Sequence, residues 1–127
     1  MAIEFTTQKG MNAPEFFGKL FQLRDQIHLT HLATKSYAQH IALGDFYDSI
    51  LDLTDSIVEQ YQGKYGIQSI SIPASSKVDP IPTLKEFAKM VDDGAVYMKF
   101  KETFIQNKID ELTSLTYQTI YKLENLK

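Results

Sequence analysis

The feature that most restricts the fold of this sequence is the spacing of its apolar residues, which recur every three or four positions along most of the chain. Residues spaced in this way lie on one side of an α-helix, so the pattern predicts a helix wherever it continues. A first helix is expected from 13 to about 34, and a second from 37 to about 62. Gly63 follows the second stripe, where glycine commonly ends a helix.

Further signals predict two more helices. A third helix is expected from 83 to about 91, a break at 92–94, and a long final helix from 95 to 125, which contains no Gly or Pro. Capping boxes, in which a polar residue and a Glu or Gln three positions later bond each other's backbone, mark three of the four helix starts. They are Asn12-x-x-Glu15, Ser36-x-x-Gln39 and Thr83-x-x-Glu86.

The segment 64–82 holds three of the four prolines and reads as a connection, because its few isoleucines have no second strand to pair with. A helix of about 25 residues is about 38 Å long, and this segment is long enough to span it. The sequence therefore predicts an all-α fold, a four-helix bundle with a long crossover between helices 2 and 3 and an up-down-down-up order. Residues 1–12 are expected to form an N-terminal tail and residues 13–127 a single domain.

Composition excludes several function classes. The chain has no cysteine, so disulfides, thiolate metal sites and thiol nucleophiles are absent, and any metal ligands must be histidines or carboxylates. Its formal charge of −3, without a basic block, disfavours direct nucleic-acid binding. No secretion signal and no apolar run of about 18 residues is present, so we expect no membrane contact and a cytoplasmic location.

Candidate functional residues gather around the turn between the first two helices. Histidines lie on both sides of this turn, and acids on the second helix are spaced so that they share one face. Imidazoles and carboxylates suit zinc, iron or manganese. Two structural interpretations compete with a metal site: His31 as a core histidine bonded to a backbone carbonyl, and the acids as a solvated helix face. The candidate ligands are His28, His31, His40, Asp48, Asp55 and Glu59.

The run from His28 to His40, followed by Asp55-Ser56-Ile57-Val58-Glu59, resembles the first helical hairpin of the ferritin-like DNA-protection proteins called Dps, and is similar to small ferritin-like proteins of tailed bacteriophages. The resemblance implies a ferritin-like bundle and a homo-oligomer, a dimer or larger, that binds iron between subunits. The ligands would be His28 or His31, with His40, from one chain, and Asp55 and Glu59, helped by Asp48, from the other. Ferroxidase activity, in the host cytoplasm for a phage protein, is also implied.

Two positions favour another interpretation. Gly44 stands where the Dps pattern has an aspartate, and Leu29 or Leu32 stands where it has a tryptophan. The alternative is a non-enzymatic helical interaction or assembly protein of a bacteriophage, which binds a host protein or a small ligand without metal.

Overall fold

A computed structural model describes residues 12–92 and 100–127 of the chain. These residues form four helices, α1 (Ala13–Ala33), α2 (Tyr37–Tyr65), α3 (Pro80–Asp92) and α4 (Thr103–Asn125), and no strand. The all-helical prediction is therefore confirmed. The predicted tail, apart from Asn12, and the Asp93-Gly94 part of the predicted break lie outside the described residues.

Two predicted helix starts are confirmed by their caps. The Asn12 side chain accepts a hydrogen bond from the backbone N–H of Glu15, and the Glu15 carboxylate accepts one from the N–H of Asn12, both at 3.0 Å. The Ser36 hydroxyl caps α2 by accepting a hydrogen bond from the Gln39 N–H at 3.2 Å. These local bonds satisfy backbone donors that have no partner within a helix.

Two boundaries of the second and third helices differ from the prediction. Helix α2 continues through Gly63 and is capped by Gly66, whose φ of 93° is a conformation that favours glycine. Helix α3 begins at Pro80 and not at Thr83. Proline is tolerated in the first turn of a helix, because the N–H groups there have no helical partner, so the third capping-box pattern lies inside α3.

The fourth helix also starts later than predicted. Residues 100–102 are not helical, and Glu102 occupies the N-cap position of α4. The apolar spacing in the sequence does not reveal this boundary, because Met98 and Ile105 lie seven positions apart and fit one helical stripe on both sides of it. Residues 95–99 of the predicted helix lie outside the described part of the chain.

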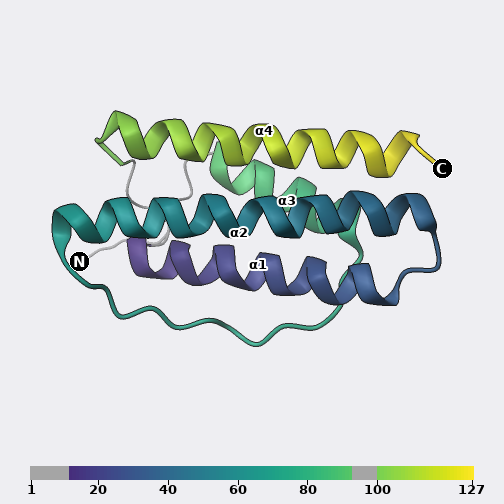
Figure 1. Cartoon of the computed structure of the whole chain (residues 1–127), viewed down its shortest axis with the longest axis horizontal. Helices are drawn as coiled ribbons and strands as arrows, with labels where there is room; N and C mark the ends of the chain where they lie inside the picture. Colours follow the sequence, from purple (N-terminus) through teal and green to yellow (C-terminus); the bar gives the residue numbers. More distant parts are fainter. Residues whose placement is uncertain (1–11, 93–99) are drawn as a thin grey trace.

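Figure 1 shows α1 and α2 side by side, joined by a short turn, with α4 along α2 and α3 packed against α4. The connection from Gly66 to Asp79 runs beside α1 and is hydrogen-bonded to it at Gln22 and at Thr30. The Gln22 side chain donates to the Ala74 carbonyl at 3.0 Å, and the Val78 N–H donates to the Thr30 hydroxyl at 2.9 Å. Gly18 permits this close approach, since a Cβ there would lie 2.2 Å from the Ser71 carbonyl oxygen.

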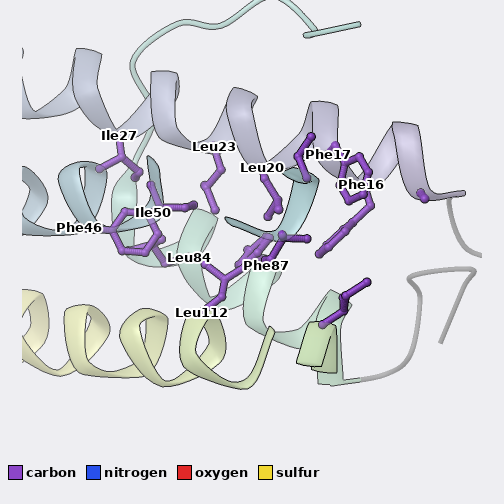
Figure 2. Close-up of a cluster of buried hydrophobic side chains, with 14 of the residues drawn as sticks. Phe16, Phe17, Leu20, Leu23, Ile27, Phe46, Ile50, Leu84, Phe87 and Leu112 are labelled. Carbon is purple, nitrogen blue, oxygen red and sulfur yellow. The ribbon is translucent and has the colours of Figure 1, made fainter. Parts of the chain in front are cut away.

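All four helices contribute to one apolar core, part of which Figure 2 shows. Its fully buried side chains include the labelled residues Phe16, Phe17, Leu20, Ile27, Phe46, Ile50, Leu84 and Leu112. Burying such side chains is the main favourable contribution to folding. Among the described helices, none is long and apolar enough to cross a membrane.

Candidate functional site

The three histidines lie at the end of the bundle where α1 turns into α2. His28 and His31 belong to the last two turns of α1, and His40 to the first turn of α2. All three side chains are half-buried. The structure therefore brings these predicted site residues together, because the turn between the helices spans only residues 34–36.

His31 and His40, the histidine pair, are each hydrogen-bonded to the backbone of the other. The Nδ1 atom of His31 lies 2.7 Å from the carbonyl oxygen of His40, and the Nδ1 atom of His40 lies 2.9 Å from the carbonyl oxygen of His31. A carbonyl oxygen can only accept, so both Nδ1 atoms carry the hydrogen that is donated. In the neutral form of each ring, Nε2 then holds the lone pair.

One of these bonds completes the end of α1. The last backbone bond at this end joins the Thr34 N–H to the Thr30 carbonyl, so the His31 carbonyl has no helical partner. Such terminal carbonyls are commonly satisfied by nearby side-chain donors, and His40 supplies one here. The other bond, from His31 to the His40 carbonyl, is the one expected of a structural His31. His40 has a matching structural role that the sequence did not suggest.

The rings at this end of the bundle are stacked in two pairs. His31 lies on His40 with centroids 3.8 Å apart and an interplanar angle of 17°. His28 lies on Tyr47 with centroids 4.1 Å apart and an angle of 11°. The Arg24 guanidinium lies 5.6 Å from the centre of the Tyr47 ring. Packing on both helices therefore restricts the orientation of each imidazole.

Gly44 makes room for His31. A Cβ atom at position 44 would lie 2.9 Å from the Cε1 atom of the His31 ring, closer than side-chain atoms normally approach. The glycine that interrupts the Dps-like pattern thus has a physical reason, because an aspartate in that place would collide with the imidazole. The absence of a carboxylate at position 44 follows from how His31 packs.

The predicted acidic ligands lie elsewhere on α2. Asp48, Asp55 and Glu59 are exposed, and no ion pair involving them occurs among the described residues. Across residues 12–92 and 100–127, no group of three or more histidines and carboxylates is arranged to hold a metal. One chain therefore does not assemble the ligand set. A site shared by two chains stays a prediction.

A second polar cluster, at the opposite end of α2, was missed by the sequence analysis. The Glu102 carboxylate is buried, accepts a hydrogen bond from Lys64 Nζ at 2.8 Å, and accepts another from the Tyr65 hydroxyl. The bond from Lys64, followed by that from Tyr65, lowers the pKa of Glu102 to about 2. The same carboxylate raises the pKa of both partners. Thirty-seven residues separate Tyr65 from Glu102, so no local signal could reveal the contact.

Comparison with known proteins finds one matching family and a similar phage protein. A family described as a family of unknown function (DUF5856) matches residues 31–123, a span that includes both members of the histidine pair. A protein of Enterobacteria phage T4, described as an uncharacterized 14.6 kDa protein in the mobD-ri intergenic region, is 35% identical over 116 residues, which cover 91% of this chain and 90% of the relative. No solved structure matches the chain.

Proposed function

The chain belongs to this family of unknown function, DUF5856, and we propose that two copies of it bind a divalent transition metal between them. The proposal rests on the arrangement of the chain's own side chains. His31 and His40 of one copy supply imidazole nitrogens, with His28 as the alternative to His31. Asp55 and Glu59 of the other copy, helped by Asp48, supply carboxylate oxygens. This donor set suits iron, zinc or manganese.

The observation that carries the proposal is the use of Nδ1 by both rings of the histidine pair. Histidines that ligate metals usually donate their other ring N–H to a carbonyl or carboxylate, which fixes the tautomer and the ring orientation. The Nδ1 contacts of 2.7 and 2.9 Å meet that condition for His31 and His40 before any metal binds. In each ring, Nε2 is therefore the nitrogen that is left to coordinate.

A second copy is required because, among residues 12–92 and 100–127 of one chain, no carboxylate joins the two histidines in a group that could hold a metal. The exposed acids of α2 have no cation partner among the described residues, so a second chain can approach them without first breaking an ion pair. A metal between the chains would also offset the repulsion between two acidic surfaces. Metal binding and association are therefore expected to depend on each other.

The proposal includes a ferritin-like, up-down-down-up order of the helices. The bonds that tie Ala74 and Val78 to α1 support it, because they carry the connection from the end of α2 back along the bundle to the start of α3. The phage T4 relative supports a role inside an infected host cell. For iron, the ferrous ion would be the substrate of a ferroxidase, and oxygen uptake on adding Fe²⁺ tests that activity.

The test measures association and metal content together. The protein is mixed with Fe²⁺ under anaerobic conditions, or with Mn²⁺ or Zn²⁺, and analysed by size-exclusion chromatography with light scattering and elemental analysis of each peak. We expect a dimer or larger assembly that retains metal. At a metal concentration 100 times Kd, binding should raise the free energy of unfolding by about 2.7 kcal/mol.

The matched variants leave the histidine pair intact. Asp55→Asn with Glu59→Gln should abolish metal retention and metal-dependent association without lowering the stability of the metal-free chain. Asp110→Asn on α4, also an exposed acid, is the control and should bind as the wild type does. A metal-free monomer under every condition would end the proposal.

A second candidate function, an interaction or assembly protein that works without metal, is favoured by apolar side chains exposed at the turn between α1 and α2. Leu32, Tyr37 and Ile41 are 65%, 78% and 44% exposed. Exposed apolar side chains gathered in one place often mark a protein interface. This candidate predicts association in the presence of EDTA that is lost in a Leu32→Ser/Tyr37→Ser variant, whereas the metal proposal predicts association that EDTA reverses.

A further inference from the structure

A groove of about 380 Å³ lies between α1 and α3, away from the histidines and from the acids of α2. Its size falls in the range of pockets that bind small molecules. Helix α1 contributes Lys19, Leu23 and Gln26, and α3 contributes Thr83, Glu86, Phe87 and Met90. The groove is therefore independent of the metal proposal in both its residues and its location.

The floor of the groove is apolar and continuous with the core. Leu23 and Phe87, which Figure 2 shows among the core side chains, are 4% and 6% exposed. Met90 is half-buried beside them. Methionine is flexible and polarizable, so it adapts to ligands of different shape. An apolar group placed here would gain contact with three side chains and remove part of their surface from water.

The rim carries one charge of each sign, on opposite helices. Lys19 on α1 and Glu86 on α3 both line the groove, and both are exposed. Within the described part of the chain neither takes part in an ion pair, with the other or with any third residue. The two charges thus face the same opening and are both available to a ligand.

We propose that this groove binds a small zwitterion with an apolar body, of the class of apolar dipeptides, with its carboxylate at Lys19, its ammonium group at Glu86 and its side chains on the Leu23–Phe87–Met90 floor. The charge pattern selects this class. A purely anionic amphiphile would pair with Lys19 and leave the Glu86 carboxylate without a partner, and a purely cationic one would pair with Glu86 and leave the Lys19 ammonium without one. Gln26 and Thr83 add neutral hydrogen-bonding groups to the lining of the groove.

The test uses the dipeptide leucyl-phenylalanine as the probe. Titrated into ¹⁵N-labelled full-length chain at up to about 10 mM, which covers weak binding, it should shift the amide signals of Lys19, Gln26 and Glu86 and leave α4 signals beyond residue 110 unchanged. Two capped probes separate the ends of the ligand. The N-acetyl form lacks the ammonium group and the C-terminal amide lacks the carboxylate, and each should bind about fivefold more weakly.

Variants assign the two charges to the two ends. Glu86→Gln should weaken binding of the dipeptide about fivefold and leave binding of the N-acetyl form unchanged. Lys19→Met should also weaken binding of the dipeptide about fivefold, and should leave binding of the C-terminal amide unchanged. Gln26→Trp should fill the groove from its rim and prevent binding, without altering a buried residue. Asn107→Trp on α4, which adds the same ring elsewhere, is its control.

The proposal is overturned if the dipeptide causes no shifts in the groove, or if both capped probes bind as well as the dipeptide does. Preferential binding of the N-acetyl form would also overturn it, because the ligand class would then be an anionic amphiphile. Since these measurements use metal-free protein and residues outside the metal proposal, failure of one proposal leaves the other intact.

Discussion

The two ends of α2 are both closed by polar side chains, but with different chemistry. At the histidine end, His31 and His40 bond backbone carbonyls across a three-residue turn. At the carboxylate end, Glu102 is buried and bonded by Lys64 and Tyr65 from a distant part of the sequence. One junction joins neighbouring helices through imidazole N–H groups, and the other joins α2 to α4 through a buried carboxylate.

The two ends differ in whether polar atoms are left over to bind a ligand. At the carboxylate end, one oxygen of Glu102 accepts both hydrogen bonds, and its charge is matched by Lys64. That cluster is complete within the chain and holds α2 to the start of α4. At the histidine end, each ring uses Nδ1 only, which leaves Nε2 of both for a partner. We therefore expect the carboxylate end to stabilise the fold and, under the metal proposal, the histidine end to bind the ligand. Four predictions test this division.

The largest effect is expected from Phe17→Ala at the carboxylate end. Phe17 is fully buried and contacts Tyr61 edge-on at 5.4 Å and Phe100 in a stacked arrangement at 6.4 Å. Truncating a buried phenylalanine costs about 3–5 kcal/mol, because contacts are lost and a cavity remains. Urea unfolding followed by circular dichroism measures the change. The control is Phe104→Ala, at a side chain that is 45% exposed, for which a loss below about 1 kcal/mol is expected.

An equal loss in the two phenylalanine variants would show that the aromatic cluster at the carboxylate end is not rigidly packed. A larger loss of unfolding free energy from Phe104→Ala than from Phe17→Ala would contradict the prediction, because the exposed face of α4 would then contribute more to stability than the buried aromatic cluster.

A smaller effect, dependent on pH, is expected from Glu102. Its pKa is about 2 in the folded chain and 4.5 as its ordinary value, so the unfolded chain binds a proton at higher pH than the folded chain. The carboxylate therefore stabilises the fold fully above about pH 4.5, and this contribution disappears as pH falls toward 2. Urea unfolding at several pH values should show that Glu102→Gln flattens the acid side of the profile.

Asp110→Asn, at an exposed acid of α4, is the control for this pH series and should keep the wild-type profile. An unchanged slope in Glu102→Gln between pH 4.5 and 2 would mean that Lys64 and Tyr65 do not hold the carboxylate in solution. The carboxylate end would then be as open to a ligand as the histidine end.

Features of the fold whose cause is local could be predicted from the sequence. The Asn12 and Ser36 caps were predicted because a cap is decided within four residues. A predicted boundary was wrong where two residues could each have ended a helix: α2 ends at Gly66, which has a positive φ, and not at Gly63. For the site, the gathering of the histidines followed from the short turn. The contact of Glu102 with Lys64 and Tyr65 depends on how α4 meets α2, which no spacing in the sequence records.

A still smaller effect is expected from His40→Ala, which tests the histidine end. The variant loses the hydrogen bond to the His31 carbonyl and the stacked ring, and alanine's better helix propensity offsets part of this, so we expect a loss of about 1 kcal/mol. Long-range ¹⁵N NMR of the wild-type imidazoles checks the same feature directly and should find the hydrogen on Nδ1 of His31 and His40. Hydrogen on Nε2 of either ring would contradict the assigned bonds.

The smallest effect is expected from Gly44→Ala, where two opposing terms nearly cancel. Alanine in a helix is favoured over glycine by about 1 kcal/mol, but the new Cβ would lie 2.9 Å from His31 Cε1 and must displace the ring. Gly63→Ala is the matched control, because no atom lies within 4 Å of a Cβ there, and it should gain up to about 1 kcal/mol. In a His31→Ala background Gly44→Ala should recover that same gain, and a double-mutant cycle measures the difference. A gain equal to that of Gly63→Ala in the wild-type chain would mean that His31 does not rest on Gly44, and the prepared Nε2 on which the metal proposal depends would be lost with it.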